Sequence, residues 1–536
     1  MNFYQVSLLL CLAAVGAAIV RAFKQPIIIG YLLAGLILAN TGVINLDYSE
    51  SLSGLGQIGV ALLLFLVGLE MNISELPSIG RASIMTGFGQ IAFTSILGFL
   101  LASALGYGPL VAVYIAIALT FSSTIIIVKL LGEKNDLGSL YGKISVGFLL
   151  VQDFFAVLVL MFLAGIRSGD TSAVSMILLF VKGTILLALV WHLSKKVIPN
   201  LFEKVLGSSP ELLFVGSIAW VLGVASLVGG PLGFTLEVGG FLAGLALANL
   251  PEHLEVASRV RPLRDFFLAL FFLYLGTTLN LTGSGAVILP AIVFSVFVLV
   301  GNPVIVLSIM GFLGYRRRTS FLASVTVAQI SEFSLIIMAM GLTLGHVGDS
   351  DMSTVVLVGI ITMTASTYLI LNSEKIFERI KNLLLVFERN STGEPKLNLT
   401  GQYKDHVVLF GIHRTGQVLA NYFEKAKMPF VSVDFNPEFH PVVFGDMGDP
   451  EILDALSLEK AKLIISTVPT LDDNEKLLEY VRNKKIATKV ITSAKTKSDA
   501  EVLKKLGADM VVVPEVVAGV YLRGLLKRKL EAKKPL

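Results

Sequence analysis

The residue with the clearest chemical potential is Asp153, which lies in the middle of an apolar run. The run reads VGFLLVQDFFAVLVL, with Gln152 before the aspartate and no basic residue after Lys143. A carboxylate at membrane depth is expensive and is therefore a functional candidate. Because desolvation favours the protonated carboxyl, a proton and a cation would compete for it. The plainer alternative is a buried aspartate that is hydrogen-bonded to a neighbouring helix.

Two polar interruptions of apolar runs supply further candidates. Thr120, Ser122, Ser123 and Thr124 offer hydroxyl and freed carbonyl oxygens, which hard cations prefer as ligands. We therefore expect Asp153 and Ser122 to bind the cation, with the other three hydroxyls nearby. The second interruption, QISEF, contains Glu332. This glutamate is either a second charge in an ion pathway or a group that neutralises a helix-end dipole.

The composition indicates a membrane protein with a soluble tail. Of 536 residues, 54% are hydrophobic and 15% charged, whereas soluble chains are about a quarter charged. Residues 1–373 consist mostly of apolar runs long enough to cross about 30 Å of hydrocarbon. Arg21 and Lys24 follow the first run, which favours a retained span over a cleaved signal peptide. The single cysteine, Cys11, excludes an internal disulfide.

The apolar runs predict thirteen spans, with the two ends of the chain on opposite sides of the membrane. They cover residues 3–20, 26–40, 52–69, 83–105, 110–131, 143–165, 172–191, 211–228, 232–250, 264–280, 285–313, 319–345 and 352–372. Alternate loops carry the basic residues Arg21, Lys24, Arg81, Lys129, Lys134, Lys143, Lys195, Lys196, Lys204, Arg259, Arg261, Arg264, Arg316, Arg317 and Arg318. The opposite loops offer only Arg167. The positive-inside rule therefore predicts an external N-terminus and a cytoplasmic tail.

An internal repeat indicates a transporter architecture. GYLLAGLILAN at 30–40 and GGFLAGLALAN at 239–249 match at eight of eleven positions, at an offset of 209. LFLVGLEMN at 64–72 similarly matches FFLYLGTTLN at 271–280, and the polar interruptions at 122–124 and 331–333 correspond. The copies lie an odd number of spans apart and should be inverted in the membrane. Inverted repeats with interrupted helices place an ion site near the midplane.

The tail predicts a separate α/β fold. Residues 374–404 contain a predicted amphipathic helix at 374–389, with Ile376, Ile380 and Leu383 on one side, and then a polar linker. Strands are expected at 406–411, 430–435, 442–446, 463–468, 490–494 and 510–514. Helical segments between them indicate a parallel, doubly wound, Rossmann-like sheet over 405–536. Between Asp434 and Val442 the chain is too short for the usual crossover helix.

The turn after the first strand of the tail predicts a nucleotide site. It reads Gly411-Ile412-His413-Arg414-Thr415-Gly416, and the following helix would offer its N-terminus to a phosphate. The expected nucleotide-binding residues are Gly411, His413, Arg414, Thr415, Gly416, Asp434, Gly445 and Asp446. His413 occupies the position where a pyrophosphate needs bare backbone. AMP is therefore expected in preference to NAD.

These motifs resemble the Kef-type potassium-efflux antiporters of the monovalent cation:proton antiporter family. The similarity rests on LLFLVGLEM around Glu70, SST at Ser122, the Gln152-Asp153 pair, QISEF, and GDMGD at 445–449. The last motif belongs to a tail that looks like the N-lobe of a regulator-of-potassium-conductance domain. The resemblance implies a homodimer in the cytoplasmic (inner) membrane that exchanges K⁺, or alternatively Na⁺, for protons through Asp153.

The resemblance also bears on coupling and on rival functions. Relatives with two adjacent aspartates favour Na⁺, so Gln152 in place of the first implies a K⁺-selective, electroneutral exchanger. A potassium channel with this kind of tail would need a filter and a pore helix, which the sequence does not supply. A membrane-anchored NAD-dependent oxidoreductase would need a catalytic domain after the nucleotide fold. The chain is therefore not expected to be an enzyme, and no nucleic-acid partner is expected.

Overall fold

The computed structural model describes residues 3–41, 49–70, 80–134, 136–165, 209–231, 234–248, 252–279, 285–387, 404–434 and 442–531, with isolated residues 181, 192, 194 and 250. The chain divides into two compact units. Unit 1 holds residues 1–130, 144–310 and 320–383. Unit 2 holds residues 131–143, 311–319 and 384–536. Short turns that join long helices therefore belong to the same unit as the tail.

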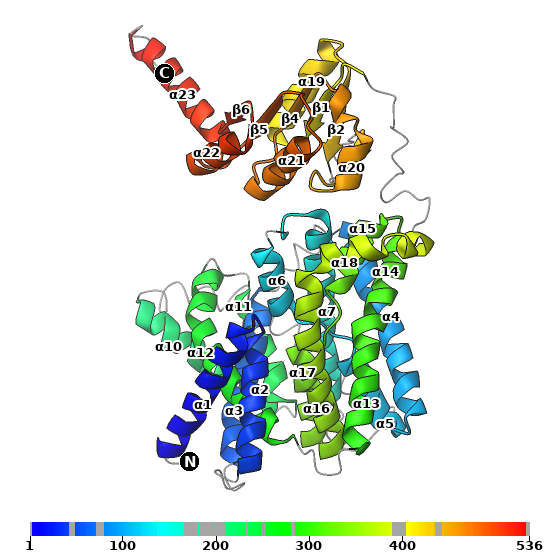
Figure 1. The fold of residues 1–536 in the computed structure, drawn as a ribbon. Helices are drawn as coiled ribbons and strands as arrows, with labels where there is room; N and C mark the ends of the chain where they lie inside the picture. Colours follow the sequence, from blue (N-terminus) through cyan, green and yellow to red (C-terminus); the bar gives the residue numbers. More distant parts are fainter. Residues whose placement is uncertain are drawn as a thin grey trace. The chain divides into compact units, whose positions relative to one another are not determined.

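Helices lie at every predicted span except 172–191, of which Val181 alone is described. They are α1 Phe3–Ala22, α2 Ile27–Thr41, α3 Ser49–Glu70, α4 Gly80–Ala104, α5 Pro109–Ala118, α6 Thr124–Glu133, α7 Leu140–Gly165, α10 Pro210–Gly229, α11 Leu236–Leu247, α12 His253–Thr277, α13 Gly285–Val296, α14 Asn302–Phe312, α15 Arg317–Val325, α16 Glu332–Thr343 and α17 Asp349–Leu371 (Figure 1). Because the seventh predicted span is otherwise not described, the count of thirteen stays a prediction.

The helices form two groups. One comprises α1, α2, α3, α10, α11 and α12, and the other α4, α5, α13, α16 and α17 (Figure 1). In the first group a Cβ on Gly35 would lie 2.1 Å from the carbonyl oxygen of Leu273, and one on Gly244 would lie 1.9 Å from that of Phe65. The α2–α12 and α11–α3 contacts thus involve equivalent glycines of the two sequence copies. Such reciprocal packing is what a pseudo-two-fold axis between the copies requires.

Two predicted spans are broken helices, as the polar interruptions indicated. The chain leaves helical geometry between α5 and α6 and again between α15 and α16. The hydroxyl of Ser122 donates to the carbonyl oxygen of Val327 at 3.4 Å, so the two breaks touch. Breaks free backbone groups, and in apolar surroundings other protein groups must pair with them.

A π-helical turn lies in the long helix opposite these breaks. Residues Phe297–Gly301 form it between α13 and α14. A π turn accommodates an extra residue and is often found at functional positions. Here it directly precedes Asn302, which reaches the first break.

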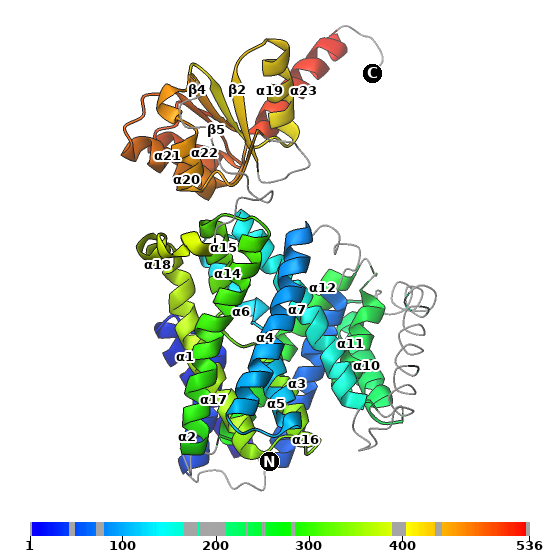
Figure 2. The ribbon, with the colours of Figure 1, turned by 90° about the vertical axis from the view of Figure 1, so that its right-hand side faces the viewer.

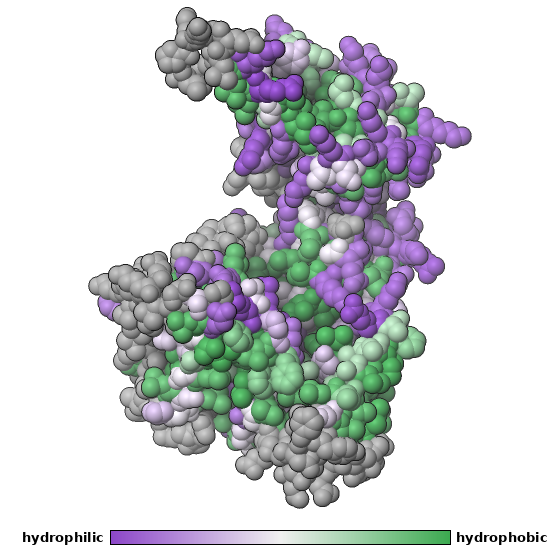
Figure 3. Space-filling view, turned by 90° about the vertical axis from the view of Figure 1, so that its left-hand side faces the viewer, coloured by the Kyte–Doolittle hydropathy of each residue, from purple (hydrophilic) through white to green (hydrophobic). Residues whose placement is uncertain are grey.

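The surface of the helices suits a membrane. Among the described residues, six helices are long and apolar enough to cross one, and shorter apolar helices accompany them. α4 has exposed side chains such as Phe88, Phe93, Ile96 and Leu100. Figure 3 shows apolar residues over much of the helical surface on the face it presents.

The tail has the predicted parallel sheet. Its strands are β1 Val407–Phe410, β2 Phe430–Asp434, β3 Val443–Phe444, β4 Leu463–Ser466, β5 Val490–Ser493 and β6 Met510–Val512, in the order β3-β2-β1-β4-β5-β6. All adjacent strands pair in parallel. This is the strand order of doubly wound dinucleotide-binding folds. The short link from Asp434 to Val442 lies outside the described residues.

Helices cover both faces of the sheet. Val407 and Leu409 pack with Phe423 of α19 (Arg414–Lys425), whereas Val408 and Phe410 pack on the other face. That other face carries α20 (Pro450–Ala455), α21 (Leu471–Asn483) and α22 (Lys497–Leu506) (Figure 2). A last helix, α23, spans Pro514–Glu531. The alternation along β1 follows from the two-residue period of a strand.

The predicted helix at 374–389 is confirmed in its first half but is too long, and Leu383 does not share the half-buried side of Ile376 and Ile380. The α-helix, α18, covers Ser373–Ile380, and Leu383–Phe387 form a separate 3-10 turn. Because a 3-10 turn has three residues per turn, the phase of the side chains shifts. Phe377 and Leu384 are buried, while Leu383 is 72% exposed.

Candidate functional site

The Gln152-Asp153 pair lies in α7, and the two side chains have different surroundings. Gln152 is fully buried and accepts from the backbone N–H of Ser122 at 3.0 Å. Its amide nitrogen donates to Oε1 of Gln90 on α4 at 2.8 Å. Both ends of the amide are therefore engaged, and Gln152 ties α7 to the first break and to α4.

Asp153 is half-buried and faces the start of α6. Its Oδ2 accepts a hydrogen bond from the hydroxyl of Thr124 at 2.8 Å. Thr124 is the first residue of α6. The free N–H groups at a helix N-terminus carry partial positive charge, which offsets a nearby carboxylate. The structure thus joins Asp153 to one of the predicted hydroxyls and to the helix end beside it.

The other predicted residues of the first break form hydrogen bonds within and around the break. Thr120 donates to the carbonyl oxygen of Ala116 at 2.8 Å and shares a hydrogen bond with Ser95 at 3.1 Å. The hydroxyl oxygen of Ser123 accepts from the N–H of Ile126 at 3.4 Å. The hydroxyl of Ser122 likewise donates to Val327, whereas that of Thr124 donates to Asp153.

Amide side chains cap the carbonyl oxygens that the first break frees. Nδ2 of Asn302 donates to the carbonyl oxygen of Leu119 at 3.0 Å, and Nε2 of Gln90 donates to that of Thr120 at 3.0 Å. Thr94 joins them by donating to Oδ1 of Asn302 at 3.1 Å. The sequence interpretation missed Gln90, Thr94 and Asn302. The usable signal was Gln90, the one amide side chain of its predicted span, with Thr94 one turn further on.

Glu332 begins α16 at the second break. It is 4% exposed and follows Ser331, whose hydroxyl accepts from the N–H of Phe333 at 3.2 Å and, with Ser334, forms a capping box. A carboxylate in the first turn favours the dipole-neutralising interpretation of Glu332. In the same break, Oε1 of Gln329 accepts from the hydroxyl of Ser366 at 2.7 Å.

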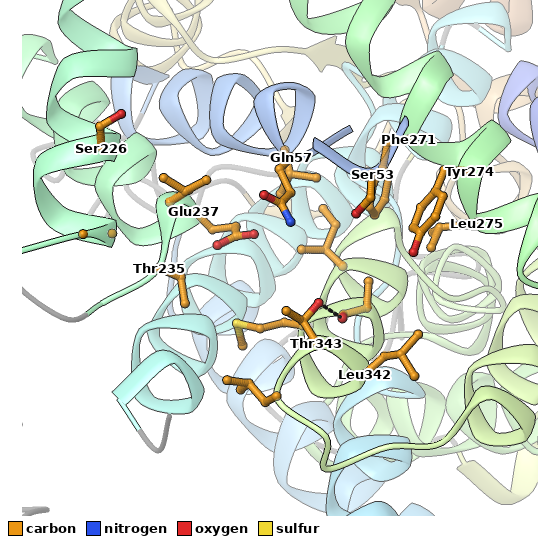
Figure 4. A pocket seen from close by; sticks show the side chains of 18 residues that line it. Ser53, Gln57, Ser226, Thr235, Glu237, Phe271, Tyr274, Leu275, Leu342 and Thr343 are labelled. Atoms are coloured by element: carbon orange, nitrogen blue, oxygen red, sulfur yellow. Dashed lines mark hydrogen bonds between the residues drawn. The ribbon is translucent and has the colours of Figure 1, made fainter. Parts of the chain in front are cut away.

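A cavity of about 570 Å³ lies at the border of the two helix groups, between α3, α11, α12 and α16. Its polar lining includes Ser53, Gln57, Thr235, Glu237, Tyr274 and Thr343. Figure 4 shows Glu237 and Gln57 directed toward the same space, and the hydroxyl of Thr343 bonded to the carbonyl oxygen of Ala339 at 3.0 Å. Asp153 is not among the described lining residues. The cavity offers one carboxylate among hydroxyl and amide groups.

The predicted nucleotide-binding residues of the tail come together at the carboxyl edge of β1, β2 and β3. Gly411 has a φ of 80°, which favours glycine, and its N–H donates to the carbonyl oxygen of Val433 at 2.9 Å. A Cβ on Gly416 would lie 1.9 Å from the carbonyl oxygen of Gly411, so the helix approaches the strand closely. Oδ2 of Asp434 accepts from the N–H of Ile412 at 2.7 Å.

The start of α19 presents the polar part of this edge. Exposed His413 is the N-cap, and Arg414, Thr415 and Gly416 form the first turn. Gly445 follows β3 and donates to the carbonyl oxygen of Asp434 at 3.0 Å. Asp446 differs from the rest, because its carboxylate accepts from the N–H groups of Gly448 and Leu140 at 2.8 and 3.0 Å.

The comparisons with known proteins agree with this geometry. Residues 7–371 match the model of the sodium/hydrogen exchanger transmembrane family, and residues 407–514 match the TrkA-N domain. Two broken helices that touch beside a half-buried aspartate are typical of a cation/proton antiporter of the inverted-repeat type. The chain belongs to the sodium/hydrogen exchanger family, and is thus a multi-pass membrane antiporter with a TrkA-N tail, not an enzyme.

Similar proteins cover both parts of the chain. "Putative K(+) efflux antiporter KefB" of Alkalimonas amylolytica is 26% identical over 93% of this chain and 77% of its own length. "Putative cation/proton antiporter YbaL" of Escherichia coli is 24% identical over 94% of both chains. The solved sodium proton antiporter MjNhaP1 of Methanocaldococcus jannaschii superposes with a TM-score of 0.51 at 14% identity, covering 71% of this chain and 97% of its own. That likeness supports the fold of the membrane part.

Proposed function

We propose that this antiporter exchanges K⁺ for protons one for one, with the carboxylate of Asp153 holding either the proton or the cation. The observation that carries the proposal is the 2.8 Å hydrogen bond from Thr124 to Asp153 at the N-terminus of a broken helix. At this position the Thr124 hydroxyl offers an oxygen ligand to a cation. The partial positive charge of the helix end offsets the negative charge of the half-buried carboxylate. Thr124 and the oxygens of the break would complete the cation's shell, with Ser122 as a further ligand.

The neutral neighbour of Asp153 supports electroneutral exchange. Both ends of the Gln152 amide are occupied, by the N–H of Ser122 and by Gln90. An amide does not titrate, so Asp153 would be the one group of this pair that takes up a proton. A single carboxylate that trades one proton for one monovalent cation moves no net charge.

We assign K⁺ as the transported ion from the names of similar proteins. KefB and the plant relatives are named as K⁺ efflux antiporters, and one of the latter is 29% identical over 61% of this chain. Na⁺ is the second candidate, favoured by the description of the family model and by the name of MjNhaP1. Oxygen ligands such as Thr124 accept either ion, and Gln152 is the feature that favours K⁺.

The remaining features of the proposal concern setting and control. The protein would be a homodimer in the cytoplasmic membrane, as the family resemblance implies. The N-terminus would lie outside and the tail in the cytoplasm, because basic residues gather in alternate loops. The tail would bind AMP, in preference to NAD, at the edge formed by Gly411, His413, Arg414, Thr415, Gly416, Asp434 and Gly445. Ligand binding there would regulate exchange if the two transport states differ in affinity for it.

A proteoliposome assay tests the transport proposal. Wild-type protein should acidify or alkalinise the lumen when a K⁺ gradient is imposed, with equal or lower rates for Na⁺ and no membrane potential generated. Asp153→Asn should fold but reduce the flux to that of protein-free liposomes, because its amide cannot hold a proton. Asp265→Asn is the matched control, since Asp265 is an exposed carboxylate paired with Arg264. Robust coupled flux in Asp153→Asn, or a wild type that carries only Na⁺, would contradict the proposal.

A further inference from the structure

The turn between α6 and α7 has an unusual density of polar contacts, all within unit 2. Asp136 is 5% exposed. One carboxylate oxygen accepts from the hydroxyl of Tyr141 and lies 3.2 Å from Nζ of Lys134. The other accepts from Nζ of Lys476 on α21 at 2.9 Å, and the same ammonium group lies 2.7 Å from Asp472.

The charge of Asp136 is fixed by these partners. Burial alone would raise the pKa of its carboxyl, but the Tyr141 hydroxyl and the charges of Lys476 and Lys134 outweigh it and lower the pKa. Burial likewise opposes the charge of Lys476, yet Asp472 and Asp136 raise the pKa of its ammonium. The two groups therefore remain oppositely charged at physiological pH, and the burial of Asp136 makes their Coulomb interaction stronger than that of a pair on an open surface.

The first turn of α7 is capped from two sides. The hydroxyl oxygen of Ser139 accepts from the N–H of Gly142 at 3.1 Å, which is ordinary capping by the preceding residue. Oδ2 of Asp446 accepts from the N–H of Leu140, the first residue of the helix, at 3.0 Å. A helix leaves its first N–H groups without internal partners, and an anion there is favourable. Asp446, far away in the sequence, supplies that anion.

The start of α15 also contacts the tail, through a side-chain ion pair and not through a backbone cap. The guanidinium group of Arg317, the first residue of α15, donates twice to Oε1 of Glu451 on α20, at 2.8 and 3.2 Å. Both side chains are partly exposed, so this ion pair by itself contributes little to stability. α7 carries Asp153, and α15 leads to the second break. The starts of α7 and α15, with the turn that precedes α7, therefore contact residues of α20 and α21 and the residue that follows Gly445 at the end of β3.

We infer that Asp446, Glu451 and Lys476 form a clamp that positions the starts of α7 and α15, and that Asp446 caps the ion-carrying helix instead of binding nucleotide. The inference rests on the proposed function. Asp153 lies thirteen residues beyond Leu140, about 20 Å along a straight helix. A rigid helix transmits a change at its first turn over that length.

The clamp connects to the predicted nucleotide edge through short backbone links. Asp446 follows Gly445, whose N–H donates to Asp434, and the Asp434 carboxylate accepts from Ile412 in the phosphate turn. A ligand that reorders this turn would shift Asp434 and, through Gly445, the position of Asp446. The hydrogen bond from Leu140 to Asp446 at the start of α7 would change with it. The clamp is thus the path from nucleotide binding to transport.

Hydrogen exchange of the full-length protein in lipid nanodiscs tests the clamp independently of transport. Asp446→Ala should raise the exchange rate of amides 140–143 about five-fold, as expected for a lost helix cap, and Asp446→Asn should raise it less because its carbonyl still accepts. Lys484→Met, which removes the exposed pair with Asp454, is the matched control and should leave these amides unchanged. Unchanged exchange in Asp446→Ala overturns the inference.

Faster hydrogen exchange in β1 and β4 would show that Asp446→Ala disturbs the fold of the tail. In that case a second pair of variants tests the clamp instead. Arg317→Glu and Glu451→Arg should each speed exchange at the start of α15, and the double reversal should restore protection. If the double variant behaves as the sum of the single ones, the contact does not hold α15 and the inference fails.

AMP as the probe separates the clamp from the proposed function. Asp446→Ala should retain wild-type AMP affinity by calorimetry while the effect of AMP on K⁺/H⁺ exchange is lost. Loss of AMP binding would make Asp446 a nucleotide ligand and would refute its positioning role. A wild type that neither binds AMP nor transports K⁺ contradicts only the proposed function. The hydrogen-exchange rates of amides 140–143 would still test whether Asp446 caps α7.

Discussion

Asp473, near the clamp, shows how burial and like charge act on one carboxyl. Burial and the neighbouring Asp446 raise its pKa to about 6, with a smaller contribution from Asp472, whereas Lys476 and a hydrogen bond from Thr470 act in the opposite direction. The folded protein therefore binds this proton more tightly than the unfolded chain does. Between about pH 4 and pH 6 the free energy of unfolding should fall as the pH rises.

Asp473→Asn should accordingly stabilise the tail at pH 8. The ionised carboxylate destabilises the folded state there, by about 2 kcal/mol when the shift is discounted for partial solvation. Hydrogen exchange of α21 and β4 in the full-length protein should slow in the variant at pH 8, and the difference from wild type should shrink toward pH 5. An equal difference at both pH values would show that the carboxyl does not titrate in this range.

At the same scale, the sequence predicted the residues that carry their own local signal. Asp153, Gln152 and Thr124 were recognisable because charge, amide and hydroxyl stand out in apolar runs, and the structure brings Thr124 to Asp153. Whether they bind the transported cation stays a prediction. Asn302 reaches the carbonyl oxygen of Leu119, which is 183 positions away in the sequence, so no local pattern could place it.

At the scale of helices, close backbone contact through glycine sets the packing of α2, α3, α11 and α12. Gly244→Ala should lower the thermal midpoint in detergent, because the new Cβ would lie 1.9 Å from the carbonyl oxygen of Phe65 and overpacking costs about 1–3 kcal/mol. Gly54→Ala is the control, since Gly54 has no atom within 4 Å of the added Cβ. A higher midpoint in Gly244→Ala would mean that the helices separate without cost.

Elements were predictable where hydrophobic period and polar interruption agreed. The breaks at 122–124 and 331–333 and the strands of the tail lie where expected, because each has a sharp change of residue type. The extent of the helix at 374–389 and the side of Leu383 were wrong, because a change from α to 3-10 geometry alters the side-chain phase without changing composition. The π turn at Phe297–Gly301 was missed for the same reason.

At the scale of the whole molecule, the tail should report the nucleotide state of the cell. Calorimetry on the full-length protein should detect AMP binding with higher affinity than NAD. The exposed His413 at the start of α19 stands where a second phosphate would need bare backbone. His413→Gly should narrow the difference between the two ligands, whereas Lys425→Met, at the far end of α19, should not. NAD binding more tightly than AMP in the wild type would contradict this prediction.

The reciprocal glycine contacts also constrain how the chain is made. α2 packs on α12 and α3 packs on α11, so Gly35 and the α3 surface that meets Gly244 lack these partners until the second sequence copy, 209 residues later, leaves the ribosome. At about 5–20 residues per second, the early helices wait in the bilayer for roughly 10 to 40 s. During that time their glycine faces contact lipid or the insertion machinery. Synthesis, and not only stability, should therefore be sensitive to substitutions at Gly35, whose partner Leu273 arrives last.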